Sequence, residues 1–368
     1  MKTAKAALFM GANESFQIRE FEVGEPGAGQ ARMRLIASGV CGTDVHIHEG
    51  TLGIEPPKII GHEFVGCIDA IDEEAAKKTG LKVGDNVISN IACPCGTCEL
   101  CKTGDDANCI NMGVTNGGNP EDAPHFHGGY GEYSFAPAEN LIYLPENVDP
   151  TAAAVCACPG PTAFHGFSLT EKAGYDIKTA RVAVVQGFGP VANFATIYLA
   201  SLGIPNVIVI SARAFDEKRE ALAKKMGATL ILSLEKDGEE KIKSVIAELS
   251  GGLGADFVFE GSGSPKAIPL GMDILRNRGV YCVPGQYSAS GGIEIQPQII
   301  TFKALRIIGS SQYSMCDVHA YVDFLANHED VQALLKDMAT GYTVDEADKA
   351  FSDAKARKNI KTLFVAER

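Results

Sequence analysis

The chain of 368 residues lacks the features that mark membrane, secreted and nucleic-acid-binding proteins. No uninterrupted apolar stretch approaches the roughly 20 residues of a membrane-spanning helix. The N-terminal segment alternates like strands and lacks the apolar core of a signal peptide. No basic run stands out and the net charge is −13, so nucleic acid and anionic membrane surfaces are not expected partners. Tryptophan is also absent, which excludes no fold or function.

What is present is typical of a globular protein of two or three domains, with 45% hydrophobic and 21% charged residues. The 11 cysteines occur without a secretion signal, which predicts a reducing, cytoplasmic location. There, cysteines serve as metal ligands or as buried apolar residues.

Four of these cysteines form a dense cluster in the segment CPCGTCELCKTGDDANC, residues 93–109. Cys95, Cys98, Cys101 and Cys109 follow the spacing C-x2-C-x2-C-x7-C. Short gaps let the sulfurs converge on one ion, and four thiolates in a tetrahedron suit zinc. An iron–sulfur cluster is the first alternative, but the ferredoxin run has a final gap of three residues followed by proline. Disulfides are a second alternative, disfavoured because such short spacings strain them. Cys93 is interpreted as a nearby non-ligand, although it could replace Cys95.

The sequence pattern divides the chain into two parts. Residues 1 to about 158 are rich in β-branched residues, glycine and proline, and short alternating runs at 32–37, 64–71 and 86–88 predict strands of a β domain. From about residue 180, apolar strands alternate with helical patterns, which predicts βαβ units and a parallel sheet. Within this part, Ser264 and Pro265 are expected to open a helix, with Gly279 just beyond its end.

A glycine-rich turn follows the first of these strands, 182–185. The turn reads Gly187-Phe188-Gly189-Pro190-Val191-Ala192 and opens a helix. A G-x-G-x-x-A pattern between a strand and a helix predicts a dinucleotide site, because the glycines let the backbone approach a pyrophosphate at the helix N-terminus. Ala192 is a tolerated replacement for the third glycine.

The end of the next strand bears on which dinucleotide is bound. Ser211 occupies the position at which an acidic residue would hold a ribose 2′-hydroxyl, and Arg213 follows it. Serine and arginine can accept a 2′-phosphate, so the pattern favours NADP over NAD. Asp216 could still serve NAD if the loop folds back.

Three further motifs, together with the cysteine cluster, resemble the medium-chain, zinc-dependent alcohol dehydrogenases over nearly the whole chain. The motifs are CGTDVH at 41–46, GHEFVG at 61–66 and CPGPT at 158–162. The resemblance implies an α/β protein with a GroES-like, β-rich catalytic domain and a Rossmann domain with a doubly wound parallel sheet. The implied bounds are 1–159 for the catalytic domain, with a structural-zinc lobe at about 93–112, then 160–303 for the Rossmann domain and 304–368 for the return to the catalytic domain.

The resemblance also implies two zinc ions per chain, one structural in the cysteine cluster and one catalytic. Position by position, it assigns the catalytic ligands to Cys41, His62 and Cys158. Cys156 lies close enough in sequence to replace Cys158, and Glu63 is an alternative or transient ligand.

The neighbouring residues acquire roles by the same resemblance. Asp44 is expected to accept a hydrogen bond from the non-ligating nitrogen of His62, the alternative being a simple turn aspartate. Thr43 is placed to hydrogen-bond the substrate oxygen, and His46 to pass the proton outward. His48 is either a pocket wall or exposed, and the loop of His125 and His127 is expected near the substrate cleft.

The implied function is reversible oxidation of an alcohol to an aldehyde or ketone with NAD(P). The segment CGTDVHIHEG, residues 41–50, is most similar to the polyol and threonine dehydrogenase branch, which favours a secondary alcohol or polyol. That branch often carries glutamate as its later ligand, where this chain has cysteine. A zinc-independent quinone or enone reductase of the same fold, or a non-catalytic binding protein, are the alternatives that the ligand set argues against. A homo-oligomer, tetramer or dimer, is also expected.

Overall fold

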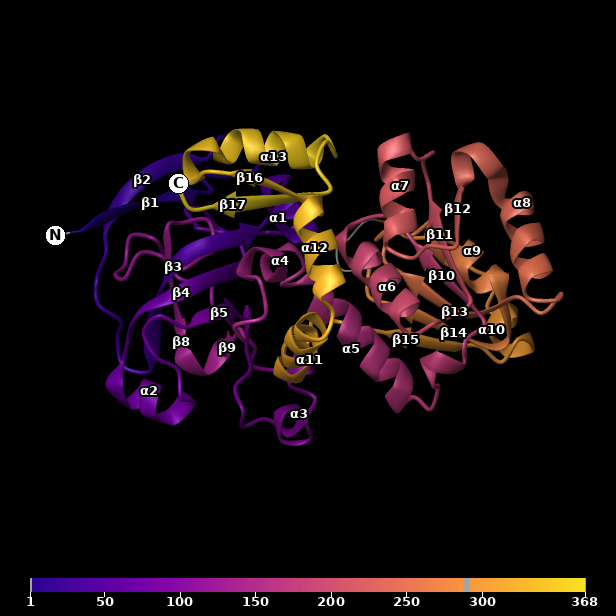
Figure 1. Cartoon of the computed structure of the whole chain (residues 1–368), viewed down its shortest axis with the longest axis horizontal. Coiled ribbons are helices and arrows are strands. Elements are labelled where there is room, and N and C mark those ends of the chain that lie inside the picture. Colours follow the sequence, from indigo (N-terminus) through magenta and orange to yellow (C-terminus); the bar gives the residue numbers. More distant parts are fainter. Residues whose placement is uncertain (1, 287–290, 368) are drawn as a thin grey trace. The chain divides into compact units, whose positions relative to one another are not determined.

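The computed structural model describes residues 2–286 and 291–367 and divides into two compact units. Unit 1 comprises Met1–Pro161 and Gln312–Arg368, and unit 2 comprises Thr162–Ser311 (Figure 1). The expected return to the first domain at residue 304 lies before the observed change of unit, because Arg306–Gly309 still pairs with the sheet of unit 2. Among the described residues, no helix is both long and apolar enough to span a membrane.

Unit 1 is built on a seven-stranded sheet. Its order is β16-β17-β3-β4-β5-β9, with β8 paired to β3, and two small two-stranded sheets, β1-β2 and β6-β7, accompany it. The strands are β1 Thr3–Leu8, β2 Gln17–Glu22, β3 Gln30–Gly39, β4 Glu63–Ile71, β5 Asn86–Ser89, β6 Ala92–Cys93, β7 Gly113–Val114, β8 Tyr133–Pro137, β9 Leu141–Tyr143, β16 Ala339–Tyr342 and β17 Lys361–Val365.

The helices of unit 1 are mostly short, and residues of α1, α2 and α13 join one core with the strands. That core includes Phe16, Phe64, Tyr130, Phe351 and Phe364. The helices are α1 Gly42–His48, α2 Glu73–Thr79, α3 Glu99–Lys102, α4 Pro150–Val155, α11 Met315–Ala326, α12 Glu329–Met338 and α13 Ala347–Lys355, with 3₁₀ turns Asp106–Asn108, Ala138–Asn140 and Val344–Glu346. Helix α5, Pro159–Lys172, begins in unit 1 and continues into unit 2.

Strand pairing in unit 1 gathers three distant segments at one end of the sheet. β3 and β4 are antiparallel with Gly39 opposite Glu63, and β17 is antiparallel to β3 with Leu363 opposite Gly39. The end of β3, the start of β4 and the start of β17 therefore lie side by side. Cys41, His62 and Lys361 occupy these three chain positions.

Unit 2 contains a six-stranded parallel sheet in the order β12-β11-β10-β13-β14-β15. Its strands read as nearly continuous apolar runs because both faces are covered. They are β10 Val182–Gln186, β11 Asn206–Ser211, β12 Leu230–Ser233, β13 Ala255–Glu260, β14 Leu275–Val283 and β15 Arg306–Gly309. This confirms the predicted α/β class with a Rossmann-type sheet.

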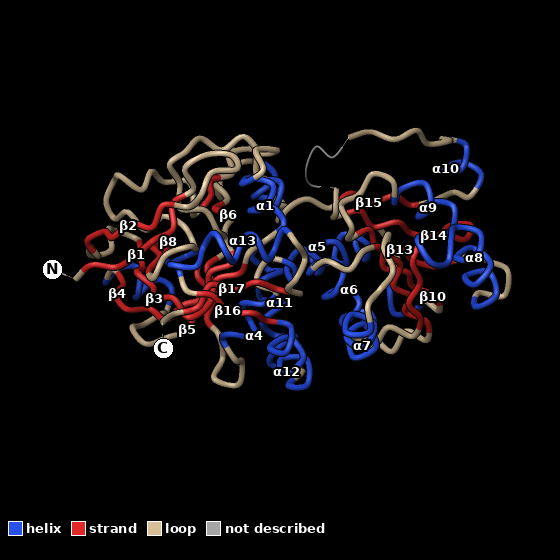
Figure 2. Tube along the Cα trace, turned by 90° about the horizontal axis from the view of Figure 1, so that it is seen from above, coloured by secondary structure: helices blue, strands red, loops and turns tan. Residues whose placement is uncertain are grey.

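Helices pack on both faces of this sheet. Ile208 and Ile210 of β11 join a core with Ile242 of α8, whereas Val209, which points to the other face, packs with Ala223 of α7. Figure 2 shows α6 and α7 on one side of the sheet and α8, α9 and α10 on the other. The helices are α6 Pro190–Ser201, α7 Glu217–Lys225, α8 Leu234–Leu249, α9 Ala267–Ile274 and α10 Gln298–Phe302, with a 3₁₀ turn at Ile177–Thr179.

One local prediction in unit 2 was wrong. Helix α9 starts after Lys266, which makes no side-chain cap, and Ser264 and Pro265 form the preceding turn, where their carbonyls accept backbone bonds. Gly279 lies inside β14 and does not end a helix. Pairing of residues 275–283 with β13 extends the strand across this glycine, so the sheet overrides the local signal.

Candidate metal centres and cofactor site

Four potential ligands converge in unit 1. Atoms of Cys41, His62, Glu63 and Cys158 all lie within 4.8 Å of one another. His62 and Glu63 are buried, and both cysteines are partly buried. Sulfur, imidazole nitrogen and carboxylate oxygen are the donors that zinc takes in proteins, and three ligands leave a position for substrate. The arrangement therefore fits a catalytic zinc.

Cys41 is held by the start of a helix. It is the N-cap of α1, with extended backbone angles, and its N–H donates to Asp44 Oδ2 at 2.9 Å. Asp44 is fully buried, and its other oxygen accepts the N–H of Gly61 at 3.2 Å. One carboxylate thus ties the loop that carries Cys41 to the loop that carries His62.

Asp44 also lies next to the His62 ring, with Oδ1 3.4 Å from Nδ1. Burial alone would lower the pKa of His62, but Asp44 and Cys41 outweigh it and raise the pKa well above its usual value. Contact with Cys158, helped by His62 and Lys361, lowers the pKa of the Cys41 thiol. A low thiol pKa favours the thiolate, the form that binds metals.

Glu63 forms a buried ion pair with Lys361 of β17. Both side chains are almost completely inaccessible, at 0% and 1% exposed. Burial raises the pKa of Glu63 to about 7, with Lys361 acting in the opposite direction. Despite its own burial, Lys361 has a raised pKa because Glu63 favours its charged form. Sequence reasoning missed Lys361, and nothing around it in the chain marks it as part of a site.

The remaining residues of the CGTDVH segment lie along α1. Thr43 Oγ1 is 3.7 Å from Cys41 Sγ, so the hydroxyl lies beside the ligand group. His46 follows three residues later and is partly buried, which places it on the same helix face as Thr43. Cys156 is outside the ligand group: it is fully buried, and burial raises its pKa to about 12.

Other histidines lie elsewhere. His48 is not exposed: its ring packs between Phe16 and Phe351, with centroids 5.3 Å away in both cases, and Nδ1 lies 2.9 Å from Lys355 Nζ. His125 stacks on Phe21 at 5.1 Å.

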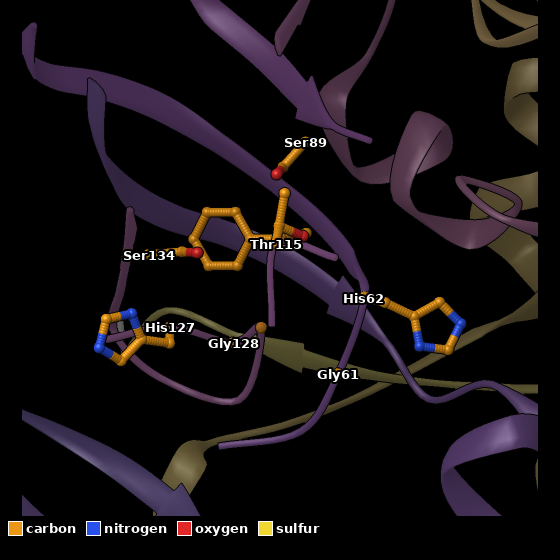
Figure 3. A pocket seen from close by; sticks show the side chains of 9 residues that line it. Gly61, His62, Ser89, Thr115, His127, Gly128 and Ser134 are labelled. Atoms are coloured by element: carbon orange, nitrogen blue, oxygen red, sulfur yellow. The ribbon is translucent and has the colours of Figure 1, made fainter. Parts of the chain in front are cut away.

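His127 lines a cavity of about 10 Å³, large enough for about one water molecule. His62, Ser89, Thr115 and Ser134 also line it, and Figure 3 shows the His62 ring pointing away from it. The cavity is too small for an alcohol substrate, and it lies on the side of His62 opposite its imidazole.

The four cysteines of the cluster also converge, with all ligand atoms within 4.8 Å. Turns of the chain direct backbone N–H groups at the sulfurs: Cys95 N to Cys109 Sγ at 3.3 Å, and Cys98 N to Cys95 Sγ at 3.3 Å. The Thr97 hydroxyl, together with the backbone N–H groups of Thr97 and Cys98, lowers the pKa of Cys95 to about 5. The set fits a tetrahedral thiolate site for zinc. Cys93 is outside it and accepts a hydrogen bond from Asn140 Nδ2 at 2.8 Å.

The glycine turn of unit 2 has the shape that a dinucleotide requires. Gly187 has φ +108°, and a Cβ there would lie 2.8 Å from Ser262 Cα. Gly189 is the N-cap of α6 and makes no side-chain cap, and a Cβ there would point into open space. Pro190, which has no N–H, and Val191 begin the helix, so the N–H groups of the first turn from Val191 onward are available to a pyrophosphate.

The loop after β11 combines Ser211 and Arg213 with two acidic residues. The Ser211 hydroxyl donates to the carbonyl of Arg213, whose side chain is exposed. Asp216 is the N-cap of α7 and accepts a hydrogen bond from Arg219 N at 2.8 Å. Its carboxylate therefore has a structural role in capping the helix. Glu235 of α8, which no sequence pattern indicated, accepts a hydrogen bond from Ala214 N at 2.8 Å.

Two family models match the chain. The alcohol dehydrogenase GroES-like domain matches residues 27–146, and the zinc-binding dehydrogenase model matches residues 190–327. The first match lies within unit 1, and the second covers most of unit 2 and the chain's return to unit 1.

Similar proteins extend over the full length. A sorbitol dehydrogenase of Halalkalibacterium halodurans is 32% identical over 352 residues, covering 95% of each chain. An L-threonine 3-dehydrogenase of Bacillus subtilis is 28% identical, covering 99% of this chain and 100% of the relative. The crystal structure of an alcohol dehydrogenase from Thermotoga maritima superimposes with a TM-score of 0.89 at 27% identity, covering 100% of both chains.

Proposed function

Because the chain belongs to the family of zinc-dependent alcohol dehydrogenases, with sorbitol and threonine dehydrogenases among its relatives, we propose that it oxidises a secondary alcohol or polyol reversibly to a ketone. The observation that carries the proposal is the convergence of Cys41, His62 and Cys158 within one 4.8 Å group. A zinc-independent reductase of the same fold has no need of that group. When bound, zinc supplies a Lewis acid at the substrate oxygen and nicotinamide exchanges the hydride.

The chain's own residues would prepare this chemistry. Asp44, whose Oδ1 lies 3.4 Å from His62 Nδ1, would orient the ring and leave Nε2 as the nitrogen that could hold a metal. Thr43, whose hydroxyl lies beside Cys41, would accept the proton of the alcohol while its own hydroxyl proton passes to His46. His46, on the same face of α1, would carry that proton toward solvent. Glu63 lies beside these residues in the ligand group, and its charge is balanced by Lys361.

The substrate class is tested with a panel of primary alcohols, secondary alcohols and polyols, following cofactor reduction spectrophotometrically with NAD and with NADP. Secondary alcohols or polyols should give the higher kcat/KM. Reduction of quinones without zinc, or cofactor binding with no turnover of any alcohol, would contradict the proposal.

For the cofactor, we propose a preference for NADP. Ser211 removes the carboxylate that would repel a 2′-phosphate, and Arg213 is an exposed arginine two residues later that can bind a phosphate by two charge-assisted hydrogen bonds. The Glu235 carboxylate accepts a hydrogen bond from this loop. Because a carboxylate would repel a 2′-phosphate, this observation favours NAD.

Replacing Arg213→Ala should weaken kcat/KM with NADP by about ten- to a hundredfold and spare NAD. Ser211→Asp should shift the preference toward NAD. An equal loss with both cofactors would show that Arg213 does not bind the 2′-phosphate, and NAD would then be the favoured cofactor.

We also propose a cytoplasmic homo-oligomer, a tetramer by resemblance, assembled through unit 2. Exposed Ile307 on the edge strand β15 and exposed Phe302 of α10 support a contact there. Light scattering should give a multiple of 38.9 kDa, and a mass equal to one chain would refute assembly.

A further inference from the structure

A fully buried carboxylate, Glu260, ends strand β13 in unit 2. One oxygen accepts three hydrogen bonds from the following loop: Ser262 N at 2.8 Å, Ser262 Oγ at 2.5 Å and Gly263 N at 3.1 Å. The other oxygen accepts from Gln286 Nε2 at 3.0 Å. All four of these donors are neutral N–H or O–H groups. Oriented N–H and O–H dipoles thus stabilise the buried carboxylate.

The loop that Glu260 holds lies against the glycine turn. Glu260 is opposite Gln186 in the sheet, one residue before Gly187, and Gly261 N donates to the Gln186 carbonyl at 3.0 Å. The Cβ that Gly187 lacks would lie 2.8 Å from Ser262 Cα. The turn and the loop are therefore packed together with no room for a side chain between them.

The topology assigns this loop to one half of the dinucleotide site. In a doubly wound sheet the dinucleotide spans the crevice where the strand order reverses, which here is between β10 and β13. The half with β10 and β11 carries the residues that face the adenosine ribose, Ser211 among them. The half that begins with β13 therefore takes the nicotinamide mononucleotide.

We propose that Glu260 is a positioning residue for the nicotinamide half of the cofactor. Its carboxylate fixes the loop 261–264 as one wall of the crevice, beside the turn that receives the pyrophosphate. The inference rests on the proposed use of NAD(P) and adds a residue outside the glycine motif and the metal centres.

The test compares two ligands that differ in the nicotinamide mononucleotide half. Calorimetry on the full-length protein would measure Kd for the reduced cofactor that the wild type prefers and for its adenosine half alone, which is 5′-AMP for NADH or adenosine 2′,5′-bisphosphate for NADPH. Glu260→Ala leaves the Ser262 and Gly263 donors unsatisfied, so affinity for the reduced cofactor should fall about ten- to a hundredfold. Affinity for the adenosine-half ligand should stay within about twofold, because that ligand contains neither the nicotinamide ribose nor the bridging pyrophosphate, and the end of β11 is untouched.

A conservative variant separates positioning from folding. Glu260→Gln keeps an acceptor for the loop, and its amide can donate to Gln286 if that amide turns, so it should restore the reduced-cofactor affinity to within about threefold of wild type. Glu248→Ala, at an exposed glutamate of α8 in the same unit, is the matched control and should change neither Kd.

If Glu260→Ala fails to fold, Gly285→Ala takes its place, because the added Cβ would lie 2.4 Å from Glu260 Oε2 and displace the carboxylate. Unchanged reduced-cofactor affinity, or equal weakening of both ligands, would overturn the inference. Failure of the proposed function is distinct from this: alcohols would then not be oxidised, while the binding comparison would still be decisive.

Discussion

The two ligand groups of unit 1 are equally compact but built in opposite ways. Cys95, Cys98, Cys101 and Cys109 come from one short segment, and backbone N–H groups of the same segment point at their sulfurs. The group with Cys41, His62, Glu63 and Cys158 is drawn from three distant segments. Local turns suffice for the first group, whereas the second exists only when the sheet of unit 1 has formed.

The surroundings differ in charge as well. Around the second group, Asp44 lies beside His62 and Lys361 pairs with Glu63, so two charged partners sit directly behind the ligands. No lysine or arginine pairs with a cysteine of the cluster in the described residues. A centre of thiolates and backbone dipoles suits a structural ion, and one with tunable charged partners suits chemistry. Substitutions at either centre test this difference between the two ligand groups.

The largest effect is expected from Cys41→Ser. Loss of a catalytic ligand should lower kcat/KM by about a thousandfold or more, since a Lewis acid supplies several kcal/mol of transition-state stabilisation. The melting temperature should change little, because the sheet that gathers the site remains. Steady-state kinetics and calorimetric melting on one preparation check both, and full activity in Cys41→Ser would contradict the assignment.

Cys98→Ser should give the opposite pattern. The cluster would lose a ligand, and the folding free energy supplied by the bound ion would be lost with it, lowering the melting temperature by about 10 °C or more. Activity measured well below that temperature should stay within about threefold of wild type, a loss of less than about 1 kcal/mol. Cys67→Ser, at a partly buried cysteine of β4 outside both groups, is the control and should leave both values close to wild type.

The buried Lys361–Glu63 pair is a feature of the second group alone, and its contribution to the free energy of unfolding can be measured. Lys361→Met leaves a buried carboxylate without its cation and should lower the free energy of unfolding by about 3 kcal/mol. Lys361→Arg should lose less, because the charge is kept. Lys349→Met removes an exposed partner of Glu346 and should cost less than about 1 kcal/mol. If Lys361→Met and Lys349→Met lowered the free energy of unfolding equally in chemical denaturation, the buried pair would contribute no more to stability than an exposed pair.

The smallest effect is expected from His46→Ala. A proton relay matters most when hydroxide is scarce, so turnover should fall by about ten- to a hundredfold at low pH and by less at high pH. His127→Ala, at a partly buried histidine outside the ligand group, should leave the pH–rate profile unchanged. A parallel downward shift at all pH values would assign His46 to the pocket wall.

The sequence could predict what is local and periodic. The strands of unit 2 can be predicted from apolar runs bounded by glycine and other turn residues, and so can the glycine turn. The cysteine cluster can be predicted from spacing alone. The catalytic set could be paired only through family resemblance, because Cys41 and His62 meet through the register of β3 and β4.

What the sequence could not predict depends on contacts between distant residues. Lys361 lies 298 positions from Glu63 and looks like any strand lysine until β17 pairs with β3. Glu260 looks like the ordinary end of an apolar strand until the loop folds back on it. His48, predicted at a pocket or on the surface, is enclosed by Phe16 and Phe351 from segments far along the chain.

Zinc content measured by plasma mass spectrometry tests the central claim most directly. The wild-type protein should hold two zinc ions per chain, and Cys41→Ser and Cys98→Ser should each hold one. The remaining ion should be the structural one in an inactive, stable Cys41→Ser protein, and the catalytic one in an active, less stable Cys98→Ser protein. A purified, fully active wild-type protein with one zinc ion or none would contradict the account.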